Sequence, residues 1–289
     1  MPLLLINGTY RVVGGAPSGA SLRFHPDDPQ AFTSLGLPVR TNATGGARVR
    51  LAGLDALETA YTPRGSARSW HQPAELAQAG AAALAAVLGF TDVQRGPDGS
   101  VVSSSPVAVP GHLLTRGVDS LGRAVGFAFP ARRRGTPDLS TVQLDATGLR
   151  DSVNWMLLRQ GVAYPVAFGG LYPDLRTELI AAAAHARGQQ RGVWPRDVTM
   201  TGFRLADREQ LQEEFVLLPR LFRRLADYLD LEGPDSVSLS GFPAYLAARA
   251  DRLVTLPDGH VTQFDSVVEV RGQRVHLTVA PEQLVFLDH

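Results

Sequence analysis

The apolar and polar positions in the first part of the chain predict a small β-barrel. Residues 3–13, 21–24 and 47–54 read as three short strands, and glycine-rich and proline-rich turns lie between them. Residues 109–117 and 124–129 form a further expected strand pair. Short strands in this order favour a meander that closes into a barrel.

Helical spacing of apolar residues predicts three helices around these strands. Residues 74–88 follow Pro73, which suits a first helical turn, and stop at Gly89. Residues 149–161 and 172–188 carry the other two patterns. Residues 91–110 show few signals of order, with a turn over residues 96–99.

The pattern changes after Asp197, and a second region, residues 198–289, is expected to follow a first domain of residues 1–197. A long helix is predicted over residues 208–231 with a break or kink at Pro219. A short helix over 242–249 and strands over 252–256, 263–270, 274–279 and 284–287 complete a small α+β region. The apolar stripe of the long helix could dock on the barrel, pair with another subunit or bind a partner protein.

Composition and charge narrow the function only slightly. The 289 residues carry 28 basic and 28 acidic side chains, so a site for a polyanion must be a local patch. The sequence holds no cysteine, which excludes disulfides and cysteine-based zinc sites. The apolar opening is too short for a signal sequence or a membrane span, so a cytoplasmic location without membrane contact is expected.

The stretch of residues 50–58 carries the candidate chemistry. It reads as a strand that delivers Arg50, Asp55 and Glu58 to one end of a sheet. Two carboxylates beside a guanidinium suit chemistry on a phosphodiester, because a hard cation can bind carboxylate oxygens while arginine binds phosphate. The glycine before Arg123 allows a tight turn that aims a second guanidinium at the same place. Arg132 and Arg133 follow in a loop as candidate phosphate contacts.

Taken together, residues 9–197 resemble the staphylococcal nuclease (thermonuclease) family, whose fold is a five-stranded OB-type β-barrel with three helices. The resemblance rests on four motifs in order: residues 50–58, Asp119-Ser120-Leu121-Gly122-Arg123, residues 153–163, and Ala184-His185-Ala186-Arg187 to Gly192-Val193-Trp194. The expected fold class is therefore α+β.

The resemblance implies specific roles for residues of this chain. It implies that Asp55 and the carbonyl of Ala56 bind Ca²⁺, with Mg²⁺ or Mn²⁺ as alternatives. It also implies that Glu58 is the general base and that Arg50 and Arg123 hold the phosphate. Tyr164 and Tyr172 lie where the family has tyrosines at its nucleotide site.

One position departs from the family pattern. The second strand of the family begins with a glycine and a metal-binding aspartate, whereas here Ala20 follows Gly19. Loss of one carboxylate lowers the charge and ligand number that set Ca²⁺ affinity. The chain is either a natural pseudo-nuclease or a nuclease in which an aspartate was replaced. Asp27 or Asp28 could supply a substitute ligand.

Three functions are therefore left open. The first is a Ca²⁺-dependent endonuclease acting on DNA or RNA, impaired by Ala20. The second is an inactive nucleic-acid-binding protein on a nuclease fold. The third is an assembly protein whose C-terminal region forms a homo-oligomer or binds a partner protein.

Overall fold

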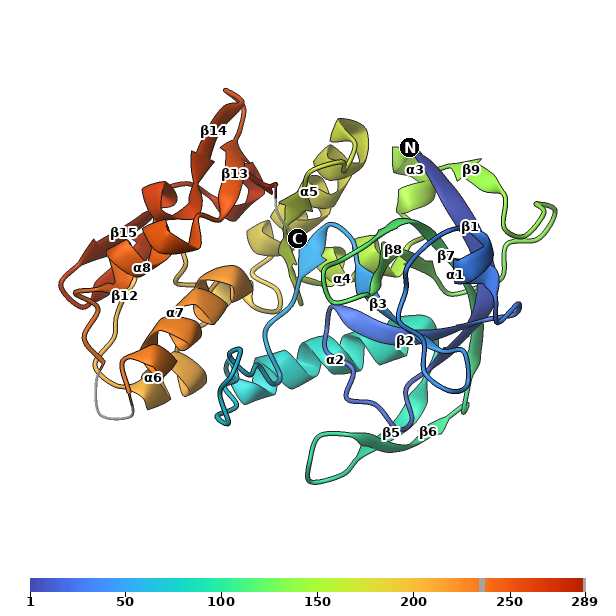
Figure 1. Ribbon diagram of the computed structural model, residues 1–289, viewed down its shortest axis with the longest axis horizontal. Coiled ribbons are helices and arrows are strands. Elements are labelled where there is room, and N and C mark those ends of the chain that lie inside the picture. The colour runs from blue at the N-terminus through green and yellow to red at the C-terminus, as the bar shows by residue number, and fades with distance from the viewer. Residues whose placement is uncertain (234–236, 288–289) are drawn as a thin grey trace.

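The computed structural model describes residues 1–233 and 237–287 (Figure 1). Five strands form a closed barrel in the order β2, β3, β8, β7 and β1, and β1 pairs back with β2. These strands are β1 (Pro2–Arg11), β2 (Ser21–Pro26), β3 (Ala47–Leu51), β7 (Val109–Val118) and β8 (Ala124–Phe129). A further strand, β9 (Thr141–Gln143), extends the sheet beyond β1. The predicted α+β fold with a five-stranded barrel is confirmed.

Alternation along β3 decides which of its side chains face the cleft described below. Ala47, Val49 and Leu51 are fully buried inside the barrel, whereas Arg48 and Arg50 lie on its outer face. β3 runs parallel to β8 and antiparallel to β2, so Arg50 lies opposite Ser21 on one neighbouring strand and Val125 on the other.

Helices cover the barrel where the sequence predicts them. The longer ones in this part are α2 (Ala74–Leu88), α4 (Val153–Gln160) and α5 (Pro173–Gly188), and the short ones are α1 (Ala31–Ser34) and α3 (Ala146–Leu149). The buried side chain of Asn154 in α4 accepts a hydrogen bond from the Ala128 amide and donates to the carbonyls of Ala52 and Gly126. This amide therefore ties α4 to the parallel pair β3 and β8.

One expectation for this part of the chain needs correction. The helix predicted over residues 149–161 is interrupted, because the Ser152 hydroxyl accepts a hydrogen bond from the Trp155 amide and begins α4 anew. The stretch 91–110, which shows few signals of order in the sequence, contains strands on both sides of its turn. It forms the hairpin of β5 (Thr91–Arg95) and β6 (Val101–Ser105) around the expected turn.

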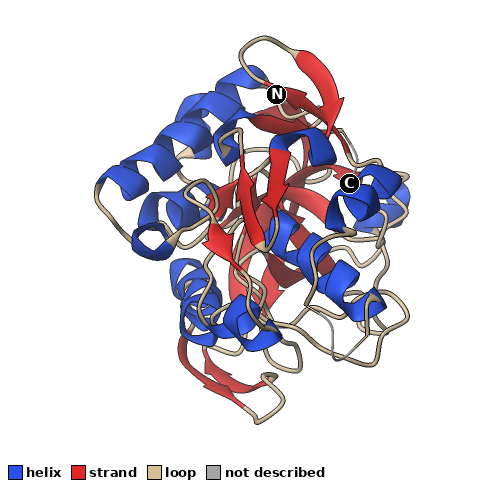
Figure 2. Ribbon diagram, turned by 90° about the vertical axis from the view of Figure 1, so that its left-hand side faces the viewer, coloured by secondary structure: helices blue, strands red, loops and turns tan. Residues whose placement is uncertain are grey.

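The C-terminal region contains helices and two small sheets, which lie together on the left of Figure 1. Its helices are α6 (Arg208–Glu213), α7 (Pro219–Leu231) and α8 (Phe242–Arg249). Its strands are β12 (Phe203–Arg204), β13 (Arg252–Thr255), β14 (His260–Gln263), β15 (Val268–Arg271), β16 (Arg274–Leu277) and β17 (Leu284–Phe286). Figure 2, which views this region end-on, shows helices arranged around the strands.

One sequence prediction for the C-terminal region is confirmed and another changes. The pattern over residues 208–231 is broken into α6 and α7 with a non-helical link, and Pro219 begins the second helix. The strand predicted over 263–270 is interrupted by a 3₁₀ turn, Phe264–Val267, which buries its first and last residues. Short 3₁₀ turns also form at Trp194–Arg196 and Pro281–Gln283.

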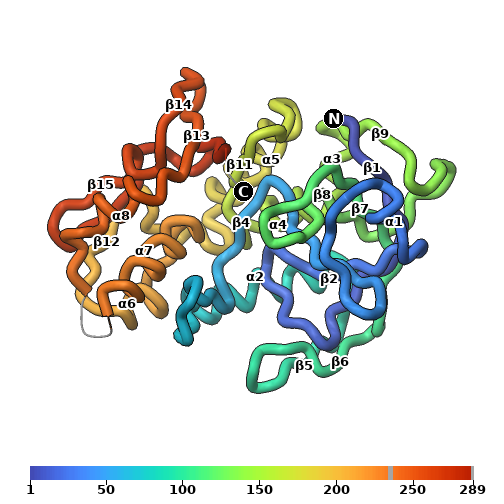
Figure 3. The backbone as a smooth tube through the Cα atoms, viewed as in Figure 1, coloured from blue at the N-terminus to red at the C-terminus, as the bar shows by residue number. Residues whose placement is uncertain are grey.

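Paired strands and a buried helix join the C-terminal region to the barrel region. β11 (Ala167–Phe168) runs parallel to β17, and β10 (Tyr164–Pro165) pairs with β4 (Leu54–Asp55). Figure 3 shows β4 and β11 close together between the two parts. The apolar stripe of α7, including Leu221, Phe222 and Leu225, is buried within the chain. Of the three placements considered for this stripe, packing inside the same chain is the one observed.

Within the described ranges, no helix is both long enough and apolar enough to cross a membrane.

Candidate functional site: an arginine-lined cleft

A cleft of about 710 Å³ lies between one end of the barrel and helix α7. Its walls come from the start of β2, from β3 and β4, from the β7–β8 turn and from the C-terminal region. Seven arginines line it: Arg48, Arg50, Arg123, Arg220, Arg223, Arg224 and Arg249. Four acidic residues line it as well: Asp55, Glu58, Asp119 and Asp251. The lining therefore has an excess of three positive charges in a protein whose formal net charge is zero.

A glycine turn directs the two candidate carboxylates into the cleft. Gly53 has a φ of +76°, a conformation that favours glycine, and it separates β3 from β4. A Cβ at this position would also lie 2.3 Å from a methyl carbon of Leu179, so the turn has no room for a side chain. The chain direction changes here, and both Asp55 and Glu58 line the cleft that Arg50 enters from β3.

Arg223 of α7 binds both of these carboxylates. Its Nη2 donates to Asp55 Oδ2 at 2.7 Å, and its Nη1 donates to Glu58 Oε1 at 2.5 Å. All three side chains are less than one-fifth exposed. A fork geometry of this kind makes arginine a strong partner for carboxylates. The guanidinium thus lies where a cation shared by the two carboxylates would be expected.

Burial and charge oppose each other in this cluster. Burial raises the pKa of Asp55, but the charges of Arg223 and Arg50 outweigh it, so that the pKa is lowered from its ordinary value. Burial also raises the pKa of Glu58, where Arg223 opposes the effect only in part, so that this pKa stays above its ordinary value. Glu58 is therefore the more basic of the two carboxylates.

Arg50 is a buried cleft arginine with an incomplete set of partners. Its Nη2 lies 3.9 Å from Asp55 Oδ1, and this buried nitrogen makes no hydrogen bond to the described residues. Its guanidinium carbon lies 5.0 Å from the centre of the Phe168 ring. Burial lowers the pKa of Arg50, while Asp55 raises it and Arg223 lowers it further. A buried, unsatisfied donor facing a cleft is an energetic cost that an anionic ligand would relieve.

The turn between β7 and β8 holds Arg123 at the start of β8, the strand that pairs with β3. Asp119 Oδ1 accepts from the amides of Leu121 and Arg123 at 3.0 and 2.9 Å, and Oδ2 accepts from Arg123 Nε at 2.6 Å. Gly122 has a φ of +76°, as the tight turn requires. One carboxylate therefore fixes both the turn and the direction of the guanidinium.

We expect Asp119→Ala to lower the free energy of unfolding by about 2 kcal/mol, because two amides and a guanidinium lose a buried charged acceptor. Asp119→Asn should lose less, since its amide oxygen can still accept from the two backbone amides. Urea unfolding of the three proteins measures both effects. Equal losses in the two variants would contradict this account of the turn.

The structure adds arginines that sequence reasoning did not assign to the site. Arg224 donates to both oxygens of Asp251, at 2.5 and 2.8 Å, and Arg220 stacks 4.0 Å from the centre of the Phe286 ring. With Arg223, they follow a spacing of three and four residues that puts them on neighbouring parts of α7. That spacing is visible in the sequence, but it does not reveal which surface the helix faces.

The residues present do not fit a resident Ca²⁺ in this arrangement. Ca²⁺ takes six to eight oxygen ligands. Ala20 lines the cleft but supplies no side-chain oxygen, and the guanidinium of Arg223 already binds Asp55 and Glu58. In the part of the chain that the structure describes, no three acidic or histidine side chains form a group that could hold a metal.

Four other predicted contacts lie away from the cleft. Tyr164 is fully buried, and its hydroxyl donates to Asp197 at 2.8 Å, so it packs in the core. Tyr172 precedes α5 and is 40% exposed, but it does not line the cleft. Arg132 and Arg133 follow the far end of β8 from Arg123, and Arg132 forms an ion pair with Asp27. The structure does not bring these four together with Arg50. Asp27 is likewise outside the cleft lining, as is Asp28.

The sequence matches no known protein-family model and no curated protein. The resemblance to thermonucleases therefore rests on the quoted motifs, and the function must be inferred from the cleft.

Proposed function

We propose that this protein binds the phosphate backbone of nucleic acid in the arginine-lined cleft. The observation that carries the proposal is the buried Arg50 nitrogen without a hydrogen bond, beside Arg123 in a cleft with excess positive charge. Arginine suits phosphate because its planar fork can donate two parallel hydrogen bonds. Arg223 binds both Asp55 and Glu58 and so offsets one of the two negative charges that would repel a phosphate.

The size of the cleft favours a single strand over a duplex. A volume of about 710 Å³ lies within the usual range of roughly 300–1,000 Å³ for sites that bind small molecules. Such a site holds a few nucleotides at most. Phe168 at the cleft wall supplies an aromatic surface, and bases commonly stack on aromatic side chains in single-strand binding proteins.

Phosphodiester hydrolysis is the second candidate function, because Arg50, Asp55, Glu58 and Arg123 all line the same cleft. Burial raises the pKa of Glu58, which suits a general base. In this candidate, Arg223 must first leave Glu58, because a carboxylate bound to a guanidinium is a poor proton acceptor. The ion pairs of Arg223 therefore favour binding over cleavage as the function of this conformation, because they engage the carboxylate that would act as the base.

Fluorescence anisotropy with labelled single-stranded DNA and RNA, in EDTA and at low salt, tests the proposed function. We expect Arg50→Gln and Arg123→Gln each to weaken binding about tenfold, because each removes one charged phosphate contact. Arg204→Gln is a matched control, since Arg204 is exposed on β12 and does not line the cleft. Gel analysis of the same mixtures reports cleavage.

The absence of measurable binding by the wild-type chain at low salt would refute the proposal. Equal affinities for the wild-type and both cleft variants would show that binding occurs elsewhere. Cleavage in EDTA would favour the second candidate function instead.

A further inference from the structure

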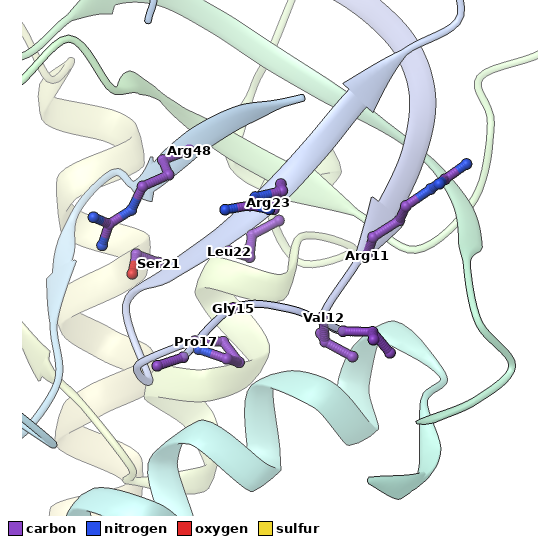
Figure 4. A pocket seen from close by; sticks show the side chains of 10 residues that line it. Arg11, Val12, Gly15, Pro17, Ser21, Leu22, Arg23 and Arg48 are labelled. Atoms are coloured by element: carbon purple, nitrogen blue, oxygen red, sulfur yellow. The ribbon is translucent and has the colours of Figure 1, made fainter. Parts of the chain in front are cut away.

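Three arginines lie directly opposite one another on the outer face of the barrel. In the strand register, Arg11 of β1 pairs with Arg23 of β2, and Arg23 pairs with Arg48 of β3. Figure 4 shows the three side chains on adjacent strands, with the guanidinium of Arg11 extending away from the other two. Arg11 and Arg48 are exposed, and Arg23 is half-buried. We name Arg11, Arg23 and Arg48 the arginine row.

The arginine row has no acidic partners. Among the described residues, none of its three side chains forms an ion pair or a hydrogen bond. By contrast, Arg123, Arg150 and Arg187 each pair with a carboxylate. Like charges at directly opposed positions of neighbouring strands are destabilising. Burial lowers the pKa of Arg48, and the charges of Arg123 and Arg23 lower it further, while the nearby Asp119 opposes them only in part. The fold therefore keeps a positively charged surface at some cost in stability.

The arginine row is continuous with the cleft. A pocket of about 220 Å³ lies over the row, and the Gly15–Pro17 segment forms one of its walls (Figure 4). Ala16, Ser21 and Arg48 line both this pocket and the larger cleft. Arg48 therefore joins two sites that would otherwise be separate, and a chain leaving the cleft beside Arg123 would meet the row next.

We infer that the arginine row is a second backbone-binding site, which holds the phosphates of a single nucleic-acid strand as the strand leaves the cleft. This inference rests on the proposed function of the cleft and extends it to longer ligands. Adjacent strands lie about 4.8 Å apart, so the three strands that carry the arginine row span roughly 10 Å. Guanidinium contacts to phosphates carry no base information, so the row adds affinity without sequence preference.

Oligonucleotides of two lengths separate the row from the cleft. Site sizes for single strands run from about 4 to 16 nucleotides per OB-type barrel, so we choose labelled oligo-dT of about 4 and about 16 nucleotides. The double variant Arg11→Gln with Arg23→Gln, which leaves the cleft residue Arg48 in place, should bind the longer strand at least about tenfold more weakly at moderate salt. Its affinity for the short strand should change much less. Arg204→Gln again serves as control.

The salt dependence gives an independent readout. For single strands, the slope of log K against log salt changes by about 0.7 for each phosphate contact, so two lost contacts should reduce it by about 1.4. A variant that only perturbed folding would weaken both lengths, and circular dichroism of each variant detects that case.

The outcomes distinguish the two proposals. If neither length binds the wild-type protein, the proposed function of the cleft fails. If both lengths bind but the double variant retains the full affinity and salt slope for the longer strand, the cleft proposal stands and the row is not a binding site. Equally tight binding of polyglutamate of similar charge would overturn the assignment of the row to nucleic acid.

Discussion

Arg223→Ala should lower the free energy of unfolding by about 3 kcal/mol at pH 7. The substitution leaves Asp55 and Glu58 beside each other with no guanidinium between them, and removal of one partner from a buried ion pair typically costs about 3 to 5 kcal/mol. We take the lower end of this range because the side chains of Arg223 and Glu58 are still 19% and 18% exposed. Urea unfolding monitored by circular dichroism measures the change.

The loss should depend on pH in a direction that identifies its cause. In the wild-type chain, Arg223 and Arg50 together lower the pKa of Asp55 despite its burial. Asp55 therefore stabilises the fold fully at pH values above 3.8, its ordinary pKa, and this stabilisation is lost as the pH falls through the lowered pKa. In the variant, burial dominates and raises the pKa of both carboxyls. A raised pKa in the folded state favours folding as pH falls, so the difference between the two proteins should shrink from pH 7 to pH 5.

Arg223→Lys is the matched control. It keeps the positive charge but loses the fork that reaches two carboxylates, so it should recover only part of the lost stability. Two results would show that these ion pairs do not hold α7 against the barrel. One is a free energy of unfolding for Arg223→Ala within about 0.5 kcal/mol of the wild-type value. The other is a loss of stability that is the same at pH 5 and pH 7.

The sequence predicts the barrel well because local patterns determine it. Alternation places Val49 inside and Arg50 outside β3 with no knowledge of distant residues. The glycine at 122 marks a turn for an equally local reason, whereas the strand predicted over residues 47–54 ends at Leu51 and turns at Gly53. The motif order then suffices to place Arg50, Asp55, Glu58 and Arg123 around one cleft.

Long-range contacts set the limits of that prediction. Arg223 lies 168 residues from Asp55, and nothing in the helical pattern of α7 shows which surface its charged positions meet. Tyr164 illustrates the opposite error. It has a residue type suited to stacking on bases, but its position in β10 places it in the core against Trp194. The residue type of Tyr164 thus suggests that it stacks on bases, but its burial in the folded chain leaves it no surface for a base.

Arg223 also explains how a cleft with two retained carboxylates can serve an anionic ligand. Without it, Asp55 and Glu58 would repel a phosphate held by Arg50. With it, the carboxylates act as anchors for α7, and Arg220 and Arg224 come to the cleft on the same helix. The C-terminal region is therefore part of the site rather than an appendage to it.

Ca²⁺ should not stabilise the wild-type chain, whereas it should stabilise the double variant Ala20→Asp with Arg223→Ala. The double substitution adds a carboxylate to the cleft that Asp55 and Glu58 line and removes the guanidinium that competes for them, the two features that a Ca²⁺ site needs here. A ligand at about 100 times its Kd stabilises a fold by about 2.7 kcal/mol. Thermal unfolding in EDTA and in excess Ca²⁺ measures the shift.

Ala20→Asp alone separates two explanations for a missing metal site. If the absent carboxylate is the only obstacle, this single variant should gain Ca²⁺-dependent stability and cleave DNA or RNA. If Arg223 excludes the cation, the single variant should respond little and the double variant strongly. We expect the second result, because the added carboxylate leaves both ion pairs of Arg223 in place. A wild-type chain that Ca²⁺ itself stabilises would contradict the exclusion, and would mean that Arg223 gives way to a metal.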